Sequence, residues 1–293
     1  MALKYELLGK RDLKAASKPK SLFSSKRGRG TALVIAGSAD FHGAPVLAAL
    51  ASLRVGAGYV KLYVPRSVVG PARNLSPNII VGALGAKSIT CNKQILDQIK
   101  RCNAIAIGMG IGRSAMAQVS ARKIVQSSVR AGKVVVVDAD AISSLKRLPV
   151  EGKLNQNIIA TPHDGEFFRL TAFRPAEKDL GARVKTAAEW ARKLGITLVL
   201  KGHYSIVTDG KRVKVNIAKT SALATMGTGD ILSGIICGYA ATGVGAFAAA
   251  CAGVYLHSSI GDSLATKMGN HIIAADVVDA IPLAIKEFDK TIQ

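Results

Sequence analysis

The feature that most constrains the fold is a regular alternation of short apolar runs and longer helical patterns from Thr31 onward. Helical patterns lie at 45–53, 115–131 and 182–194, and glycines follow the last two where helix C-caps are expected. The apolar runs, each suited to a strand buried on both faces, lie at 32–36, 59–64, 104–107, 134–137, 157–160 and 197–200. The alternation predicts an α/β fold, with a doubly wound, mostly parallel central sheet and helices on both faces.

Two later segments refine this prediction. The stretches 205–208 and 213–216 flank Asp209-Gly210, a strong hairpin signal, so the sheet is expected to have a short antiparallel edge. The uncharged run 231–256 is long enough to span a bilayer. However, the glycines of 243–245 divide it into two helices of ordinary length, and it lacks aromatic belts and flanking positive charge. We therefore predict two buried helices and no membrane contact.

The chain is strongly basic, with a formal net charge of +21. Such a charge raises the question of nucleic-acid binding, because lysine and arginine neutralise phosphates. Nine basic residues lie within positions 1–30, but no aromatic side chains alternate with Lys26, Arg27 and Arg29 to stack on bases. We expect no dedicated nucleic-acid partner. We divide the chain into a basic N-terminal segment, 1–25, forming a peripheral helix and loop, and one domain, 26–293.

Cysteine usage and length indicate the setting of the protein. The four cysteines lack CxxC spacing and no secretory leader precedes them, so we expect reduced thiols and a cytoplasmic location. A chain of 293 residues is long enough to bury a sizeable core. We also expect a homo-oligomer.

The loops that follow the predicted strands hold the candidate chemistry, because ligands of doubly wound sheets bind at the carboxyl ends of the strands. These loops are 37–43, 108–112, 138–140 and 161–166. The glycines of 108–112 fall too early for a dinucleotide fingerprint, so this loop is either tolerant of anions or simply packed tightly. Asp138 and Asp140 suit either Mg²⁺ near phosphates or an Asx turn with a helix N-cap. His163 is either a donor to substrate or a structural histidine.

The tract 224–230 is the most suggestive of these features. Gly227 and Gly229 let the backbone approach a ligand, and the helix that follows directs unpaired N–H groups at the same place. Such a place suits phosphate. A carboxylate, Asp230, is unfavourable beside a phosphate unless it accepts a proton or helps to hold a metal ion. The alternative is a helix cap in which Asp230 only accepts N–H bonds.

Taken in order, these segments resemble the ADP- or ATP-dependent NAD(P)H-hydrate dehydratase family, of ribokinase-like fold, from Lys26 onward. The segments that match are 33–38 with 43–44, 53–58, 107–112, 137–141, 161–163 with 165–166, 200–202, and 227–230 with Leu232. The resemblance implies repair of hydrated nicotinamide cofactor. ADP or ATP would phosphorylate the hydroxyl added to the dihydropyridine ring, and loss of phosphate would regenerate NADH or NADPH.

The resemblance also implies roles for single residues. Asp230 would be the catalytic base, and Mg²⁺ is expected at the phosphates, with Asp140 as a candidate ligand. The positions matching the hydrated-cofactor site are Ala44, Gly110, His163 and Asp230. The positions matching the nucleotide site are Lys201, Gly202, His203, Tyr204, Ser205, Gly227, Thr228 and Gly229.

Some positions depart from the family pattern. Met109 and Asp164 stand where the family usually has proline, and Phe41-His42 stands where it usually has Tyr-Ser. The glycine- and asparagine-rich approach to the GTGD tract is replaced by 218–226, which includes Lys219. Two other functions remain compatible with the residues: a small-molecule kinase of the same fold, and a basic, non-catalytic protein that binds nucleotide or nucleic acid.

Overall fold

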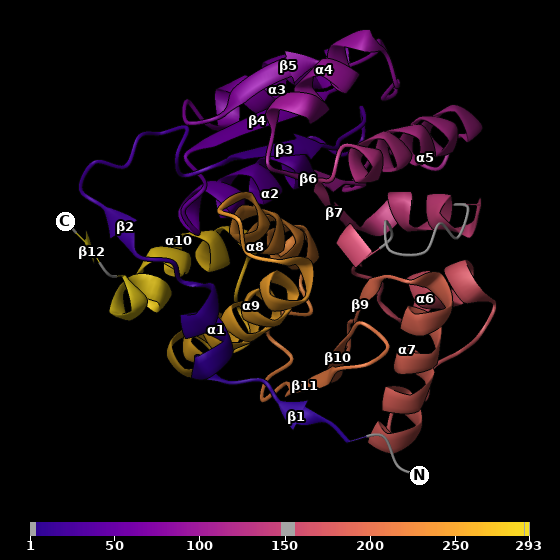
Figure 1. Ribbon diagram of the computed structural model, residues 1–293, viewed down its shortest axis with the longest axis vertical. Coiled ribbons are helices and arrows are strands. Elements are labelled where there is room, and N and C mark those ends of the chain that lie inside the picture. Colours follow the sequence, from indigo (N-terminus) through magenta and orange to yellow (C-terminus); the bar gives the residue numbers. More distant parts are fainter. Residues whose placement is uncertain (1–3, 148–155, 290, 293) are drawn as a thin grey trace.

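One large sheet forms the centre of the computed structural model, which describes residues 4–147, 156–289 and 291–292 (Figure 1). Its ten strands in the described residues are, in spatial order, β1 (Glu6–Leu7), β11 (Val213–Ile217), β10 (Tyr204–Thr208), β9 (Thr197–Leu200), β8 (Ile158–Ala160), β7 (Val134–Val137), β6 (Ala104–Ile107), β3 (Thr31–Ile35), β4 (Tyr59–Val64) and β5 (Ile80–Ala83). The six predicted strands are all present, so the predicted sheet is confirmed.

The pairing of these strands is mostly parallel. All neighbours from β9 to β5 are parallel, whereas β10 pairs antiparallel with both β9 and β11. The predicted antiparallel edge is therefore confirmed. The strand order changes direction between β3 and β6, and doubly wound sheets bind ligands in the crevice at such a switch point.

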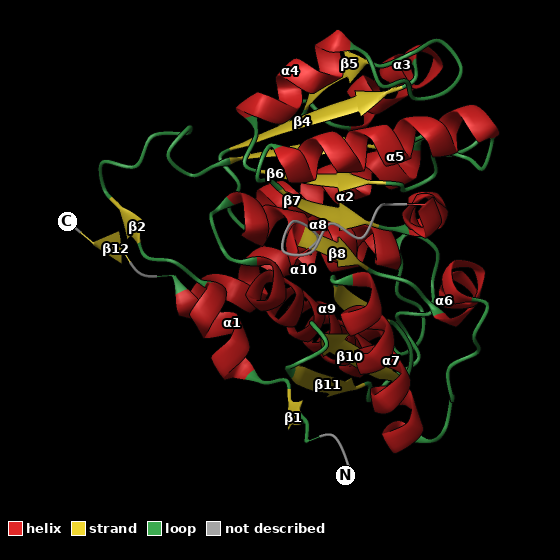
Figure 2. Ribbon diagram, turned by 45° about the vertical axis from the view of Figure 1, so that its right-hand side comes forward, coloured by secondary structure: helices red, strands yellow, loops and turns green. Residues whose placement is uncertain are grey.

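Helices cover both faces of the sheet (Figure 2). Because successive side chains of a strand point to opposite faces, Val34 of β3 joins one core and Leu33 and Ile35 join the other. Packed on the Val34 side are α1 (Lys10–Ala16), α2 (Gly43–Arg54), α3 (Arg66–Leu75), α8 (Thr228–Ala241), α9 (Ala246–Met268) and α10 (Ala274–Ile285). Packed on the opposite side are α4 (Lys93–Arg101), α5 (Ala115–Arg130), the 3-10 helix η1 (Ala139–Arg147), α6 (Asp164–Thr171) and α7 (Leu180–Leu194).

Close packing of small residues explains the uncharged run 231–256. A Cβ on Gly234 would overlap the carbonyl oxygen of Ala48, and a Cβ on Gly238 would lie 2.8 Å from the carbonyl oxygen of Ser52. The backbones of helices α8 and α2 are therefore in direct contact at these glycines. The run is divided near Gly243 into α8 and α9, as predicted, and no helix within the described residues could cross a membrane.

The N-terminal segment is more than the predicted helix and loop. Strand β1 pairs parallel with β11, and Leu13 of α1 is 2% exposed in the core beneath α9. Further along, β2 (Lys20–Ser21) pairs with β12 (Thr291–Ile292), and η3 (Lys286–Phe288) precedes that strand. The N-terminal residues thus extend the main sheet and lie beside the C-terminal ones.

Candidate functional site

Loops from several strands meet along the carboxyl-terminal edge of the sheet. Gly37 N–H, after β3, donates to the Met109 carbonyl, after β6, at 2.8 Å. Lys201 N–H, after β9, donates to the Pro162 carbonyl, after β8, also at 2.8 Å. Loops that are distant in sequence are therefore joined in pairs at the edge of the sheet where the fold predicts a ligand.

An ion pair between a partly exposed lysine and a buried aspartate lies at this edge of the sheet. Lys201 Nζ is 3.0 Å from Asp138 Oδ1 and 3.7 Å from Glu166 Oε2. Asp138 is 1% exposed, and the hydroxyls of Thr161 and Ser233 also donate to it, at 2.7 and 2.8 Å. Asp138 is thus not the Asx-turn residue that was one alternative; its carboxylate orients the lysine.

The GTGD tract begins helix α8 beside this ion pair. Gly227 has φ +91°, a backbone conformation that favours glycine, and an added Cβ would lie 2.8 Å from Leu47 Cδ1, which would have to shift. A Cβ on Gly229 would lie 3.6 Å from Lys201 Nζ. The first N–H groups of α8 and the ammonium of Lys201 therefore offer positive charge at one place.

Asp230 lies in the first turn of α8. Burial and the nearby Asp138 and Glu166 carboxylates together raise its pKa to about 7, with the Lys201 ammonium opposing them. Burial lowers the pKa of Lys201, but Asp138, Glu166 and Asp230 outweigh burial, so the pKa of Lys201 is raised. The result is a permanent cation beside a carboxyl that changes charge near neutral pH.

His163 has a structural role in this geometry. Its Nδ1 accepts hydrogen bonds from the N–H groups of Gly165 (3.0 Å) and Glu166 (3.4 Å), so it caps α6. The Glu166 carboxylate accepts the backbone N–H of His163 in return, at 2.9 Å. The imidazole is 55% exposed, and this leaves it accessible to a substrate at the same edge.

The glycine-rich loop 108–112 lies at the switch point of the sheet. A Cβ on Gly108 would overlap the Asp138 carbonyl oxygen, and one on Gly110 would lie 2.5 Å from Phe41 Cβ. The interpretation of tight packing therefore holds at both glycines. Phe41 is 48% exposed and borders Gly110, while Ala44 lies one turn before Leu47 on α2, the helix that contacts Gly227.

The segment matched to the nucleotide is a tight turn. Ser205 Oγ accepts from Gly202 N–H at 3.3 Å and donates to the Gly202 carbonyl at 2.9 Å. The rings of His203 and Tyr204 meet edge to face, with centroids 4.6 Å apart. Of this segment, only Lys201 forms an ion pair with Asp138 and Glu166 through its side chain.

Two of the three residues that the structure adds to this region, Ser233 and Arg183, were not predicted from the sequence. Glu166 and Ser233 contact the ion-pair centre, and Arg183, on α7, bonds to the carbonyls of Lys201 and Tyr204. Glu166 was part of the family pattern, but Ser233 and Arg183 lie within helices with no local signal. Their roles depend on contacts between distant segments.

Asp140 does not offer a free metal ligand. One of its carboxylate oxygens accepts the Gly112 N–H and the other accepts Arg113 Nε–H, each at 3.0 Å. No group of three His, Cys, Asp or Glu side chains suited to a metal occurs in residues 4–147, 156–289 and 291–292. This donor set does not fit a metal held by the protein alone, and Mg²⁺ would need ligands from nucleotide phosphates.

The altered approach to the GTGD tract has its own internal contacts. Thr228 Oγ1 donates to the carbonyls of Leu223 (2.7 Å) and Thr225 (2.9 Å), and the Leu223 side chain packs against Gly261 of α9. Met226, at the end of this approach, is 88% exposed. The loop is therefore anchored at Leu223, and it presents the apolar side chain of Met226 to solvent next to the GTGD tract.

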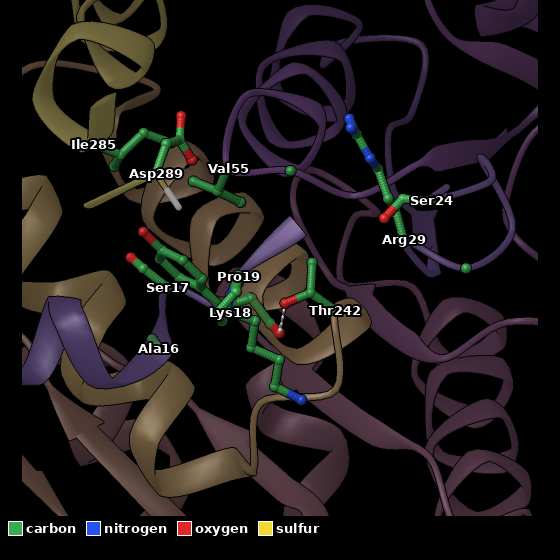
Figure 3. Close-up of a pocket in the computed structure, with 13 residues that line it drawn as sticks. Ala16, Ser17, Lys18, Pro19, Ser24, Arg29, Val55, Thr242, Ile285 and Asp289 are labelled. Atoms are coloured by element: carbon green, nitrogen blue, oxygen red, sulfur yellow. Dashed lines mark hydrogen bonds between the residues drawn. The ribbon is translucent and has the colours of Figure 1, made fainter. Parts of the chain in front are cut away.

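A cavity of about 140 Å³ lies elsewhere, at the C-terminal end of α8 (Figure 3). It is lined by Ser17, Val55, Tyr239 and Thr242, among others, and by none of the predicted site residues. A wider hollow of about 560 Å³ near Gly245 and Arg212 also contains none of them. Both hollows are separate from the loops at the carboxyl-terminal edge of the sheet.

Comparisons with known proteins agree with this geometry. A family model described as NAD(P)H-hydrate dehydratase matches residues 32–283. The chain is 32% identical to an ADP-dependent (S)-NAD(P)H-hydrate dehydratase of Nitrosopumilus maritimus, over 91% of this chain and 92% of that protein. It is 33% identical to a bifunctional NAD(P)H-hydrate repair enzyme of Pyrobaculum aerophilum over 90% of this chain, but spans only 52% of that longer protein.

Solved structures support the same assignment. The ADP/ATP-dependent NAD(P)H-hydrate dehydratase of Bacillus subtilis, co-crystallised with ATP and Mg²⁺, superposes with a TM-score of 0.81 at 29% identity, covering 98% of this chain and all of that one. An Enterococcus faecalis protein of the ribokinase-like superfamily gives a TM-score of 0.82 at 24% identity, covering 99% of both chains, and shows the fold. The chain therefore has a ribokinase-like fold and belongs to the NAD(P)H-hydrate dehydratase family.

Proposed function

We propose that this chain dehydrates hydrated NADH or NADPH at the expense of an adenine nucleotide. The observation that carries the proposal is the position of Asp230. This carboxyl, with a pKa of about 7, lies in the first turn of α8 beside the Lys201 ammonium and the glycine cradle. A base whose pKa lies near the working pH can accept a proton from an alcohol and still be ionised in a useful fraction of molecules.

In this mechanism the ring hydroxyl of the hydrate donates its proton to Asp230 as its oxygen attacks the terminal phosphorus. The bond to the nucleotide leaving group breaks, which releases AMP from ADP, or ADP from ATP. Negative charge on the transferred phosphoryl group lies against the first N–H groups of α8 and the Lys201 ammonium. Phosphate then leaves with the C–O bonding electrons, the neighbouring ring carbon loses a proton, and NADH or NADPH is regenerated.

The residues around Asp230 maintain this arrangement. Asp138 holds the Lys201 ammonium at 3.0 Å and helps to keep it protonated. Ala44, Gly110 and His163 are proposed to contact the hydrated cofactor, and Lys201 to Ser205 with the cradle are proposed to contact the nucleotide. Mg²⁺ is proposed to arrive with the nucleotide and neutralise phosphate charge, consistent with the ATP and Mg²⁺ used for the Bacillus subtilis relative.

An activity assay tests the proposal directly. Hydrated NADH or NADPH is mixed with the protein, ADP or ATP, and Mg²⁺, and the absorbance of the reduced ring is followed. We expect recovery of the reduced cofactor, with turnover that rises with pH up to about 7, because Asp230 must be ionised to act as base. No recovery with either nucleotide would reject the dehydratase. A stable phosphorylated product would instead identify a kinase of the same fold.

The homo-oligomer and the cytoplasmic location stay predictions. Size-exclusion chromatography with light scattering would test the first, and imaging of the tagged protein in its own cells would test the second.

A further inference from the structure

Arg183, on α7, is one of the largest fully buried side chains among the described residues, with 1% of its surface exposed. An arginine has five N–H donors, and burial is costly unless each has an acceptor. Here each does. Two go to the Asp164 carboxylate at 2.7 and 3.1 Å, and one each goes to the carbonyls of Ala176 (3.2 Å), Lys201 (2.8 Å) and Tyr204 (2.8 Å).

These acceptors belong to both sides of the proposed site. Asp164 is the first residue of α6 and follows His163, the residue assigned to the hydrated cofactor. Lys201 and Tyr204 lie in the segment assigned to the nucleotide. The guanidinium also lies directly beneath this segment, because a Cβ on Gly202 would be 2.6 Å from Arg183 Nη2. One planar cation thus fixes the shape of the 201–204 turn and joins it to the start of α6.

We propose that Arg183 is a positioning residue for nucleotide binding, and that Asp164 is its counter-ion. By holding the two carbonyls of the turn, Arg183 sets where the Lys201 side chain begins and how the 201–205 segment faces the nucleotide. The inference rests on the proposed function only for the identity of the ligand as an adenine nucleotide. A merely structural arginine would affect folding and would not select between the two substrates.

The Asp164 counter-ion can be removed without changing the backbone conformation at the start of α6. Asp164 is the first residue of α6, a position where proline is favoured because its N–H has no intrahelical partner. His163 before it is extended, with φ −79° and ψ 171°, as a residue preceding proline must be. Asp164→Pro therefore deletes the carboxylate and keeps α6.

The experiment measures nucleotide binding and turnover in Arg183→Lys and Asp164→Pro. Lysine keeps the positive charge but cannot bond to Asp164 and both carbonyls in one plane. We expect the nucleotide Kd, from calorimetry with ADP and with ATP, and the nucleotide KM to rise about tenfold or more in Arg183→Lys. In Asp164→Pro the three carbonyl contacts remain, so we expect a rise of about threefold. The KM for the hydrated cofactor should change less than twofold in both.

A matched control lies on the same helix. Arg192 donates from Nη2 to the Gly210 carbonyl at 3.0 Å, at the β10–β11 turn, so Arg192→Lys should leave the nucleotide Kd unchanged. A nucleotide Kd within twofold of the parent in Arg183→Lys would overturn the proposal, and if that variant does not fold, the same result in Asp164→Pro would overturn it. Loss of affinity in equal measure for both substrates would also reject it. Because binding is measured without turnover, a protein that binds nucleotide but does not dehydrate the hydrate would reject the proposed function alone.

Discussion

The two ends of helix α8 lie in contrasting surroundings. At its N-terminal end, Asp230 faces an ammonium and two carboxylates, and its pKa is raised to about 7. At its C-terminal end, Gly238 and Tyr239 pack against apolar side chains and backbone near the cavity of Figure 3. One end places a carboxyl within the ion pair of the site, whereas the other packs against α2 beside a cavity that Lys18, Arg29 and Asp289 help to line. The comparison teaches that a single apolar helix serves as a rigid support at one end and as a reactive surface at the other.

The largest effect is expected at the charged end. Asp230→Asn preserves the shape of the side chain but removes the base, so we expect turnover to fall by about 10²- to 10⁴-fold with nucleotide binding nearly unchanged. Steady-state kinetics with calorimetry of ADP would check this. Undiminished turnover would show that the charged end of α8 is not the reactive one.

The same variant is expected to be more stable in alkaline solution. The folded protein retains a proton on Asp230 that the unfolded chain releases above the ordinary pKa of 3.8. Stability supplied by the raised pKa is therefore present at low pH and is lost as pH rises from about 4 to about 7. Asparagine does not ionise, so Asp230→Asn does not lose this stability as the pH rises. The melting temperature of Asp230→Asn should exceed that of the parent at pH 8, and the gap should shrink at pH 4.

The next effect concerns the middle of α8, where it meets α2. A Cβ on Gly234 would overlap the Ala48 carbonyl oxygen, so Gly234→Ala must push the two helices apart. We expect a loss of about 1–3 kcal/mol in the free energy of unfolding, as for other overpacked cores. Chemical denaturation would measure it. Turnover per folded molecule should change less than in Asp230→Asn, and an equal fall in both would erase the contrast between support and reactive end.

A smaller effect is expected on the pH profile when Lys201 is replaced. Its ammonium lowers the pKa of Asp230, so Lys201→Met should move the acid limb of the turnover profile to higher pH. The nucleotide KM should also rise, because the cradle loses its cation. The control is Lys193→Met on α7, whose ammonium lies over the Trp190 ring. An acid limb that stays in place would show that Lys201 does not act on Asp230.

The smallest effect is expected at the C-terminal end of α8. Tyr239 Oη is buried with no hydrogen-bond partner in the described residues, so Tyr239→Phe removes a polar atom that gains nothing from burial. We expect unchanged turnover and a free energy of unfolding that is equal to the parent's or higher by up to about 1 kcal/mol. Denaturant melts and the standard assay would measure both. A marked loss of turnover would show that this end also influences the chemistry.

Much of the fold follows from local pattern. The six predicted strands are rich in apolar residues because most of their side chains are buried, with Lys61 as the charged exception, and the hairpin was marked by Asp209-Gly210. The strands that were missed are short or lie at an edge of a sheet. Strand β5 leaves Ile80 53% exposed at an edge, and β1 has only two residues. Strand β1 is too short to show a periodic pattern, and the apolar run that contains β5 is interrupted by Gly82.

The candidate site was predictable in its parts but not in its interactions. The GTGD tract, the strand-end loops and Lys201 are visible in the sequence, because glycines and turns have local requirements. The pairing of Lys201 with Asp138 joins residues 63 positions apart, and that of Ser233 with Asp138 joins residues 95 positions apart. Arg183 lies in an ordinary amphipathic helix, and nothing in its neighbourhood in the chain indicates five acceptors.

The sequence by itself determined the order of strands and helices, the division of the uncharged run, and the glycine cradle before α8, because each depends on side-chain periodicity or backbone freedom within a few residues. Only the tertiary structure decided that Asp230 has a pKa near neutrality and that Asp140 is already bonded to Gly112 and Arg113. The reason is physical. Burial and neighbouring charge set the pKa of a carboxyl, and both are properties of the folded surroundings rather than of the residue.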